Sequence, residues 1–391
     1  MIPVAEALAR VLALARPPGV EEVPLARAAG RVLAEPVTAT RDQPPFDAAA
    51  MDGYAVAGDP APGTRFRVIG MAQAGAAYPG RVGQGEAVRI FTGAPLPRGA
   101  ARVLIQEDMT AEGDHVTLGP AAEAATHIRP RGADFAAGHR LAPRRLRPAD
   151  LALLAAMNVG RVPVHRRPVV ALIATGDELV MPGEAPGPDQ IVASNIFALR
   201  AMAQSEGAET RILPIARDRA EALAAVLRLA AGADVIVTVG GASVGDHDLV
   251  GAVAAGMGME RAFYKIAMRP GKPLMAGRLG DSVLLGLPGN PVSAIVCGHL
   301  FLLPLLRAMQ GLPPGPDPRR AVLARALPPN GPRAHYMRAR LIPGAGLPQI
   351  DPYDDQDSAR LVLLADADAL LIRPPGDPAR AAGAEMDWLA L

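Results

Sequence analysis

The sequence predicts a multidomain protein of the α/β plus β class, with a mostly parallel sheet at its centre. At roughly 150 residues per domain, the 391 residues correspond to two to four domains. Between residues 169 and 309, apolar strand-like runs alternate with amphipathic segments, a pattern typical of parallel sheets with right-handed crossovers. Residues 64–130 and 319–391 instead carry short apolar runs separated by Gly and Pro, as small β domains do.

Composition and charge exclude several classes of protein. Half of the residues are hydrophobic and 20% are charged, so the chain is not intrinsically disordered. The net charge is +1, whereas general binders of nucleic acid or anionic membranes carry a basic excess. The single cysteine, Cys297, lies in an apolar stretch and has no partner for an intramolecular disulfide. We therefore expect a cytoplasmic protein that binds neither nucleic acid nor a membrane.

The first 166 residues predict two helices, a β module and a third helix. Apolar residues recur on one helical face from Val4 to Ala15, and Pro17-Pro18-Gly19 ends the pattern. A second short helix is expected to end at Gly30. The short strands of residues 64–130 follow, and another helix opens at Pro148 and closes before Gly160.

The central segment supplies the elements of the parallel sheet. The expected strands span residues 169–174, 211–214, 234–239, 261–265 and 283–287. The expected helices span residues 196–206, 219–231, 249–255 and 292–309. The uncharged stretch 282–306 is divided by the turn Pro288-Gly289-Asn290-Pro291 into a strand and a helix, so we expect no membrane span. Ligands of such sheets bind beyond the carboxyl ends of the strands, here after Ala174, Val239 and Leu287.

The last part of the chain predicts a linker and a small β domain. Residues 313–318 are rich in Pro and Gly, and strand candidates follow at 369–372 and 386–389. The sequence contains no internal repeat and no Cys/His spacing typical of a metal site.

Two turns of the predicted sheet combine carboxylates with flexible backbone. Thr175-Gly176-Asp177-Glu178 follows the first strand, and by itself it can be only a polar turn. The second turn, from Gly240 to Asp248, adds three glycines, the hydroxyl of Ser243 and two more acids. Backbone amides of such turns cradle phosphate oxygens, and nearby carboxylates hold the Mg²⁺ that accompanies them. The sequence thus predicts a divalent cation held by Glu178, Asp246 and Asp248.

Two further turns predict an anion site. Lys265 and Lys272 are the only lysines, and Arg269-Pro270-Gly271-Lys272-Pro273 places two cations on a Pro-stiffened turn. Pro288-Gly289-Asn290-Pro291 opens a helix whose free N–H groups attract anions. The four turns together predict a site for a phosphorylated ligand.

A competing motif lies in the second turn. Gly241, Ser243 and Gly245 match the nucleophile elbow of α/β hydrolases, which also follows a strand. A triad would then need Asp281 with His299 or His335. This hypothesis leaves the two lysines and the Pro-Gly turns unexplained.

The segment from Pro44 to Val56, which carries Pro44-Pro45 and Met51-Asp52-Gly53-Tyr54, resembles the signature of molybdopterin molybdenumtransferases. Members of this family insert molybdate into adenylylated molybdopterin, and related domains form part of eukaryotic gephyrin. Further motifs occur in the family's order over nearly the whole chain, namely 175–179, 194–195, 240–245, 270–273 and 286–291.

The resemblance implies a fold and domain boundaries. The central domain would be a three-layer α/β domain that binds molybdopterin, between split N-terminal helical and β domains and a C-terminal β barrel. The implied boundaries are 1–30 with 134–165 for the helical linker domain, 31–133 for the β-rich domain, 166–312 for the molybdopterin-binding domain and 313–391 for the barrel.

The resemblance also implies roles for individual residues. The implied catalytic residues are Asp52, Asp134, Glu178, Asp218, Asp248, Lys265 and Arg269. The implied substrate-binding residues are Thr175, Gly176, Asp177, Ser194, Asn195, Gly240, Gly241, Ser243, Gly245, Pro270, Gly271, Lys272, Pro288, Gly289, Asn290, Pro291 and Ser358. Asp218 has an alternative, a helix-capping role with Glu221. Arg269 stands where many members have Lys, and Ala49 stands where Ser is common.

By this resemblance the protein is an enzyme that converts adenylylated molybdopterin and molybdate into molybdenum cofactor and AMP. The resemblance implies Mg²⁺, transient contacts with other proteins of molybdenum cofactor biosynthesis, and a homodimer in which Asp52 reaches the α/β site of the other subunit. Two alternatives stay open besides the hydrolase. An adenylyltransferase or pyrophosphatase of the same fold would lack residues 51–54 and the C-terminal domain, and a non-catalytic scaffold would bind without turnover.

Overall fold

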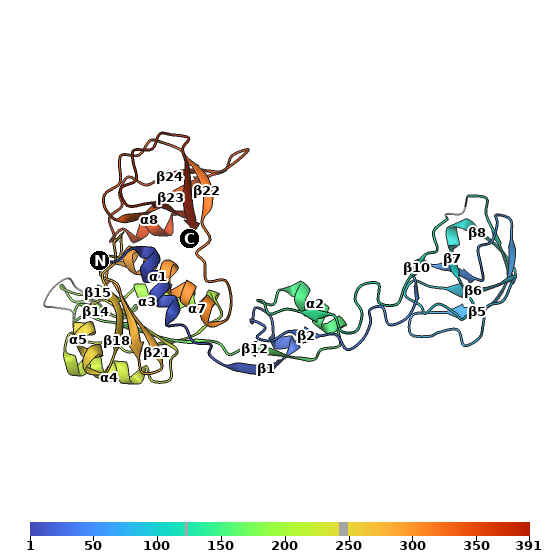
Figure 1. Ribbon diagram of the computed structural model, residues 1–391, viewed down its shortest axis with the longest axis horizontal. Helices are drawn as coiled ribbons and strands as arrows, with labels where there is room; N and C mark the ends of the chain where they lie inside the picture. Colours follow the sequence, from blue (N-terminus) through green and yellow to red (C-terminus); the bar gives the residue numbers. More distant parts are fainter. Residues whose placement is uncertain (122–123, 242–248) are drawn as a thin grey trace. The chain divides into compact units, whose positions relative to one another are not determined.

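The computed structural model describes residues 1–121, 124–241 and 249–391. The chain forms two compact units, which we call unit 1 (Met1–Glu21 with His165–Leu391) and unit 2 (Glu22–Val164). Figure 1 labels their elements. The four domain boundaries expected from the sequence stay a prediction.

The centre of unit 1 is a six-stranded, mostly parallel sheet of order β16-β13-β17-β21-β20-β18. Two of its strands, β18 and β21, are labelled in Figure 1. Its strands are β13 (Val169–Ala174), β16 (Glu209–Ile212), β17 (Val235–Val239), β18 (Glu260–Tyr264), β20 (Met275–Leu279) and β21 (Ser282–Leu287). β13 runs parallel to β16 and β17, and β17 runs parallel to β21. β20 is antiparallel to both of its neighbours. The mostly parallel sheet predicted from the sequence is confirmed.

Helices cover both faces of this sheet because its strands are apolar on both sides. Val170 and Leu172 of β13 lie in one buried cluster, and Ala171 and Ile173 lie in the other. The first cluster includes residues of α1 (Val4–Ala13), α3 (Asn195–Ser205), α6 (Pro291–Cys297), a π-helical turn (Gly298–Leu302) and α7 (Leu303–Met309). The second includes residues of α4 (Ala220–Leu229) and α5 (Leu249–Gly256). The result is a three-layer α/β fold.

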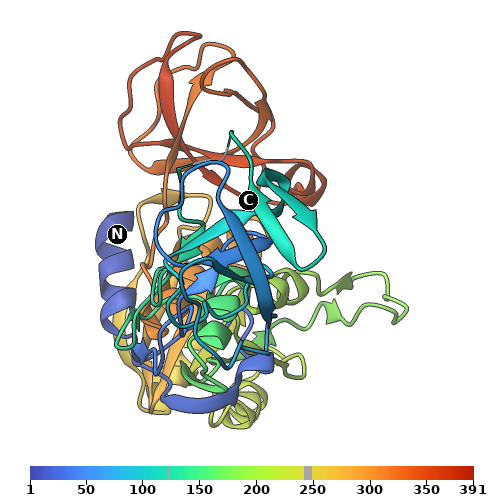
Figure 2. The same cartoon turned by 90° about the vertical axis from the view of Figure 1, so that its right-hand side faces the viewer.

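The end of the chain forms a closed five-stranded barrel, coloured orange to red in Figure 2. Its strands are β22 (Arg319–Leu323), β23 (Ala334–Ile342), β24 (Gln349–Pro352), β25 (Ala369–Arg373) and β26 (Glu385–Ala390). Pairing of β23 with β25 closes the sheet on itself, and α8 (Leu361–Ala365) lies between β24 and β25 in the chain. The short strand β19 (Met268–Arg269) pairs with β23 and so joins the barrel to the α/β part.

Unit 2 contains a second six-stranded sheet, of order β7-β4-β6-β5-β9-β8. Its strands are β4 (Gly53–Val56), β5 (Arg65–Ala72), β6 (Glu86–Ile90), β7 (Arg102–Ile105), β8 (Met109–Glu112) and β9 (His115–Leu118). Ala55 and Val56 point to different buried clusters, as successive strand residues do. The short strands β3 (Ala48–Ala49) and β10 (Ile128–Arg129) pair beside the Asp52 segment.

The remaining part of unit 2 is built around α2 (Pro148–Ala156). Two strand pairs accompany it, β1 (Val20–Pro24) with β12 (Arg161–His165) and β2 (Val37–Thr38) with β11 (Arg140–Leu141). Leu33, Leu154 and Val162 share one buried cluster in this part. The helix expected to end at Gly30 is a single 3₁₀ turn, Leu25–Arg27.

One helical stretch, Pro291–Met309, is long and apolar enough to cross a membrane. Its most apolar window is 78% buried inside the fold, where it packs against the central sheet. This burial is typical of a core helix. The helix begins directly after the turn that the sequence predicted to separate it from β21.

Candidate functional site

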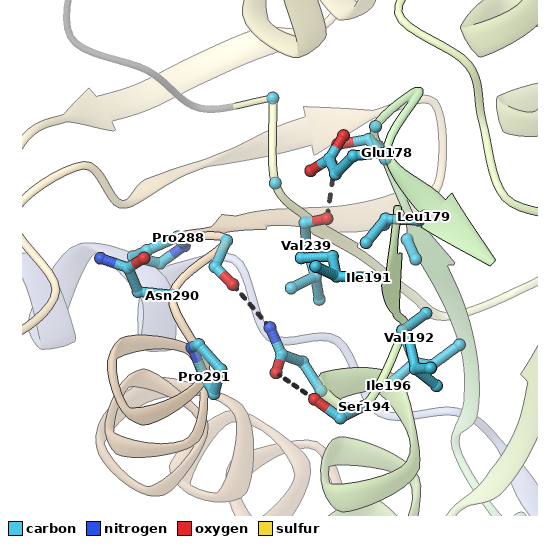
Figure 3. A pocket seen from close by; sticks show the side chains of 18 of the residues that line it. Glu178, Leu179, Ile191, Val192, Ser194, Ile196, Val239, Pro288, Asn290 and Pro291 are labelled. Carbon is cyan, nitrogen blue, oxygen red and sulfur yellow. Dashed lines mark hydrogen bonds between the residues drawn. The ribbon is translucent and has the colours of Figure 1, made fainter. Parts of the chain in front are cut away.

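A cavity of about 600 Å³ lies at the carboxyl ends of β13, β17 and β21, and we call it the cleft (Figure 3). The sequence directed attention to these three strand ends. The predicted site residues that line the cleft are Thr175, Gly176, Glu178, Ser194, Asn195, Asp218, Gly240, Gly241, Pro288, Gly289, Asn290 and Pro291. The structure thus brings together residues that are up to 116 positions apart in the sequence (175 to 291).

The floor of the cleft is held by hydrogen bonds between the strand ends. The N–H of Thr175 donates to the carbonyl of Val239 at 3.0 Å, and the Thr175 hydroxyl donates to the same oxygen at 3.3 Å. The N–H of Gly240 donates to the carbonyl of Leu287 at 3.1 Å. Gly240 has φ +98°, and a Cβ there would lie 2.6 Å from the carbonyl oxygen of Thr175. Only glycine fits this close approach of two turns.

An arginine that the sequence analysis did not identify organises the first turn. Nη1 of Arg217 donates to the carbonyls of Gly176, Asp177 and Leu179 at 3.3, 2.9 and 3.1 Å. The Asp177 carboxylate accepts the N–H of Asp218 at 3.2 Å, and Asp177 does not line the cleft. Its contact is structural. Arg217 follows β16, the neighbour of β13, so its place beside the predicted Asp218 was the available signal.

The capping alternative for Asp218 is wrong. The N-cap of α4 is Arg219, and no side-chain hydrogen bond caps this helix. The carboxylate of Asp218 is instead exposed and lines the cleft together with Glu178.

Side-chain amides hold the opposite wall of the cleft. Nδ2 of Asn195 donates to the carbonyl of Gly289 at 2.7 Å, and the Ser194 hydroxyl donates to Oδ1 of Asn195 at 3.2 Å (Figure 3). These contacts fix the start of α3 against the turn after β21. Ser194 and Asn195 therefore shape the wall as well as line it.

The barrel adds a loop to the same wall. Nδ2 of Asn290 donates to the Ser358 hydroxyl at 2.9 Å, and the N–H of Val292 donates to the Ser358 carbonyl at 3.1 Å. Ser358 itself does not line the cleft, but the next residue, Ala359, does. The N–H of Val292 is thus used within the protein, which reduces the number of free donors predicted at the start of this helix.

An apolar surface forms another side of the cleft, and the sequence analysis did not predict it. Leu179, Ile191 and Val192 face the cavity beside Ile196, opposite Pro288, Asn290 and Pro291 in Figure 3. Leu179 belongs to β14 (Leu179–Val180) and the other two form β15 (Ile191–Val192), which pairs with it in parallel. Ile191 is 59% exposed and Val192 is 41% exposed. Apolar side chains kept in contact with solvent beside polar turns are typical of a ligand site.

The three predicted cations border the cleft without lining it. Lys265, Arg269 and Lys272 lie on the loop whose last residue, Pro273, is part of the lining. Lys265 has φ +68°, a left-handed conformation that residues other than glycine rarely adopt. Its Nζ lies 4.6 Å from the centre of the Tyr264 ring.

This loop is packed against two buried side chains. Gly271 has φ +107°, and a Cβ there would lie 2.6 Å from Sγ of Cys297. Cys297 is fully buried, and burial raises the pKa of its thiol. Arg269 pairs in register with His335 of β23. Burial, together with Arg269 and three further arginines, lowers the pKa of His335 to about 4, so His335 is neutral at pH 7.

Asp52 and Asp134 belong to unit 2, where the chain brings their segments together. The N–H of Asp134 donates to the carbonyl of Gln43 at 2.9 Å, directly before the segment 44–56 that carries Asp52. Oδ1 of Asp52 accepts the N–H and the hydroxyl of Thr92, both at 2.7 Å. These two hydrogen bonds lower the pKa of Asp52, so its carboxylate is ionised and fixed in position.

Four predicted site residues lie outside the described residues: Ser243, Gly245, Asp246 and Asp248. Within the described residues, no group of three or more His, Cys, Asp or Glu side chains could hold a metal ion. The predicted cation ligands Asp246 and Asp248 are among the residues not described, so the Mg²⁺ site stays a prediction.

The geometry does not support the serine hydrolase. Asp281 directly precedes β21, while Gly240 directly follows the parallel strand β17, so Asp281 and Gly241, the first residue of the predicted elbow, are at opposite ends of the sheet. His299 lies in the π-helical turn, where burial and Arg307 lower the pKa of its imidazole to about 4. A triad that includes Asp281 is therefore wrong.

Three family models match consecutive parts of the chain. They are described as the MoeA N-terminal region (domain I and II), a probable molybdopterin binding domain and the MoeA C-terminal region (domain IV), and they match residues 2–158, 171–308 and 320–391. A crystal structure of a molybdopterin biosynthesis MoeA protein from Pyrococcus horikoshii has a TM-score of 0.85 and 32% identity. The match covers 100% of this chain and 99% of the Pyrococcus chain.

Two curated relatives are named molybdopterin molybdenumtransferase. The Nostoc protein is 35% identical over 95% of this chain and 88% of its own length, and the Bacillus subtilis protein is 34% identical over 96% and 90%. Because this identity extends over nearly the whole of each chain, and because the three models match in order, the chain belongs to the molybdopterin molybdenumtransferase family of MoeA proteins.

Proposed function

We propose that the protein inserts molybdate into adenylylated molybdopterin, releasing AMP and forming molybdenum cofactor. The observation that carries this proposal is the cleft, where glycine-rich turns, two carboxylates and an apolar side meet beside the cationic loop 265–273. A relative that is 35% identical is named molybdopterin molybdenumtransferase, which supports the transfer of molybdenum to molybdopterin. The cleft suits a ligand with phosphate groups and a flat ring system, because glycine amides bind phosphate and apolar side chains pack against rings.

The protein's own residues would orient the two reactants and balance their charge. Lys265, Arg269 and Lys272 would neutralise the phosphates of the leaving AMP and the incoming molybdate. Gly241 would hold a phosphate by its N–H group, since the N–H of Gly240 already donates to the carbonyl of Leu287. The dithiolene of the substrate, rather than a protein side chain, would take up the molybdenum, so the reaction requires no covalent nucleophile from the chain.

Mg²⁺ is part of this proposal. Glu178 is exposed in the cleft, and its carboxylate accepts no hydrogen bond from any described residue, so this group is available to a cation. Oxygen ligands of this kind are those that Mg²⁺ prefers. Together with Asp246 and Asp248, Glu178 would hold the ion, which when bound supplies positive charge to the phosphate oxygens.

We also propose that the working unit is a cytoplasmic homodimer in which Asp52 and Asp134 serve the cleft of the other subunit. Asp52 is held ionised by Thr92 on an exposed loop. Met51 beside it is 42% exposed and Phe46 is 39% exposed, and exposed large apolar side chains are typical of a partner-facing surface. The unpaired, buried thiol of Cys297 fits a reducing compartment such as the cytoplasm.

The proposal is tested by reconstitution. The purified protein is mixed with adenylylated molybdopterin, molybdate and Mg²⁺, and AMP is measured over time. We expect AMP to appear only when molybdate is present. AMP release at the same rate without molybdate would support the pyrophosphatase alternative, and tight binding of the substrate without AMP release would support the scaffold alternative. Either result would refute the proposed reaction.

A further inference from the structure

A second, smaller cavity of about 180 Å³ lies at the other end of the central sheet. Asp234, which directly precedes β17, and Asp281, which directly precedes β21, are part of its lining. The parallel strands therefore begin at this cavity and end at the cleft. Three arginines complete the charged lining: Arg16, Arg166 and Arg278. We call this cavity the arginine pocket.

One of these arginines, Arg166, is held by the fold through all three of its nitrogens. Nε of Arg166 donates to the carbonyl of Pro18 at 2.8 Å, and Nη1 donates to the carbonyl of Arg167 at 3.0 Å. Nη2 donates to Oδ1 of Asp234 at 2.7 Å. Oδ2 of Asp234 accepts the N–H of Val169 at 2.7 Å. Arg166 and Asp234 thus compensate each other's charge, and each nitrogen of Arg166 already donates one hydrogen bond within the protein.

Arg278 is different. Its Nη2 donates to the carbonyl of Leu14 at 2.5 Å, but its Nη1 is buried and has no hydrogen-bond partner among the described residues. Within the described part of the chain, no carboxylate lies within ion-pair distance of Arg278. Buried polar groups are almost always hydrogen-bonded, and leaving one unsatisfied is costly. The guanidinium therefore has both a free donor and an uncompensated charge.

The remaining pair of the arginine pocket is weak. Nη1 of Arg16 lies 3.3 Å from Oδ1 of Asp281, and both side chains are largely exposed, that of Asp281 completely. Exposed pairs of this kind contribute little, because water screens them. Asp281 can therefore turn away into solvent and leave Arg16 and Arg278 facing the same cavity.

We propose that the arginine pocket binds a small tetrahedral oxyanion, the chemical class of phosphate, sulfate and molybdate, between Arg278 and Arg16. The planar guanidinium group, with parallel N–H donors, matches the oxygens of such an ion. The cavity is well below the roughly 300–1,000 Å³ of pockets for drug-sized ligands, so it suits an ion with a few waters rather than a nucleotide. This proposal does not depend on the reaction in the cleft.

The bound ion would also tie two segments together. Leu14, Arg16, Pro17 and Pro18 belong to the segment that leaves α1, whereas Arg278 belongs to β20. An oxyanion that bridges Arg16 and Arg278 links this segment to the sheet. Binding should therefore raise the melting temperature of the protein, since a ligand bound only by the folded state stabilises it.

The experiment uses the full chain and measures binding without turnover. Phosphate, sulfate and molybdate are each titrated by calorimetry and by thermal melting, at ionic strength held constant with chloride, and AMP is titrated in parallel. For wild type we expect binding of the free oxyanions, which Arg278→Met weakens by about tenfold or more and Arg278→Lys weakens less. Crystals soaked in molybdate should show its anomalous signal beside Arg278.

A matched control separates this site from general effects of charge and from the cleft. Arg211 on β16 also has a buried nitrogen without a hydrogen-bond partner, and it does not line the arginine pocket. Arg211→Met should bind the oxyanions as wild type does. Arg16→Gln, which removes only an exposed pair, should weaken binding by a smaller factor and serves as the test if Arg278→Met does not fold.

Three outcomes would overturn the proposal. The first is equal oxyanion binding by wild type, Arg278→Met and Arg16→Gln. The second is that no oxyanion has an effect beyond that of chloride. The third is that AMP binds at Arg278 while the free ions do not.

Discussion

Lys272 is the residue through which the cationic loop is most directly tested. It precedes Pro273 of the cleft lining, and its backbone carbonyl accepts the N–H of Ile266 at 3.1 Å. Truncation to alanine keeps this backbone contact and removes the charge that we propose contacts a phosphate. We expect Lys272→Ala to weaken binding of adenylylated molybdopterin by roughly ten- to a hundredfold, with little change in melting temperature.

Binding is measured by calorimetry in the absence of molybdate, so that no turnover occurs. Arg200→Ala, on the exposed side of α3, is the control and should bind as wild type does. Wild-type affinity of Lys272→Ala would show that the two lysines lie close together by coincidence.

His335 gives a residue-scale prediction about pH. Burial, with Arg269 and other arginines, lowers the pKa of its imidazole from 6.5 to about 4 in the folded protein. Between pH 6.5 and pH 4 the unfolded chain therefore binds a proton that the folded chain does not. The free energy of unfolding should fall as pH falls through this window, by on the order of 3 kcal/mol from this group.

Urea unfolding at several pH values measures this contribution. His335→Gln should reduce the loss of stability between pH 6.5 and pH 4. Part of the loss should remain in this variant, because the pKa of His299 is also lowered to about 4. His139→Gln, which replaces an exposed histidine, is the matched control substitution. If His335→Gln and wild type lose stability in parallel over this window, the buried neutral state of His335 is wrong.

At the scale of elements, the close approach of two turns at Gly240 is the feature that shapes the floor of the cleft. Alanine at this position must adopt φ +98° and place its Cβ 2.6 Å from the Thr175 carbonyl oxygen. Gly232 has φ +76° and nothing within 4 Å of a Cβ, so Gly232→Ala carries only the conformational cost. We expect Gly232→Ala to cost about 1 kcal/mol and Gly240→Ala to cost at least about 1 kcal/mol more.

The difference in free energy of unfolding between the two variants isolates the steric contact. Gly240→Ala should also weaken ligand binding in the cleft, whereas Gly232→Ala should not. Equal stability of the two variants would show that the turns after β13 and β17 can separate without cost.

The parallel strands could be predicted because their sequences are apolar on both faces. β13 and β21 read as continuous apolar runs, and their observed bounds, 169–174 and 282–287, lie within a residue of those expected. β20 was not predicted as a strand. It contains Gly277, where a Cβ would lie 2.5 Å from the carbonyl oxygen of Glu260 on β18. Its strand structure depends on this packing between two neighbours, which no local pattern contains.

In the site, too, the features with a local sequence pattern could be predicted and those that depend on strand pairing could not. The glycine-rich turns have local patterns, and those described lie where the sequence placed them. Arg217 was not assigned, because its contacts with the turn 176–179 depend on β16 being the neighbour of β13, and its place beside Asp218 is the one local signal. Ile191 and Val192 read as an ordinary short apolar run, and only the pairing of β15 with β14 places them at the cleft.

At the scale of the whole molecule, the proposed shared site makes a prediction about mixed dimers. Asp52→Asn keeps an oxygen that can accept the Thr92 hydrogen bonds, and Glu178→Gln keeps the shape of an exposed side chain, so both variants should fold. Each should be nearly inactive alone. In a mixed dimer with shared sites, one site carries both changes and the other carries neither, so activity should return.

The two variants are dissociated, mixed and reassociated, and AMP release is measured after heterodimers have been demonstrated by mass. Wild type treated in the same way is the control for recovery. No return of activity in proven heterodimers would refute the shared site, and a monomeric mass at working concentration would refute the dimer.

The central claim is that molybdenum is inserted into molybdopterin in the cleft and that the adenylyl group is released as AMP in the same reaction. Its most direct measurement is the amount of molybdenum bound by the pterin product per AMP released, in wild type and in Glu178→Gln. Glu221→Gln, at an exposed residue of α4, is the control. We expect one molybdenum per AMP for wild type and control. In Glu178→Gln we expect both products to form about two orders of magnitude more slowly, because the substitution removes a key electrostatic group. Wild-type rates in Glu178→Gln, or AMP release without molybdenum in the product, would contradict this account.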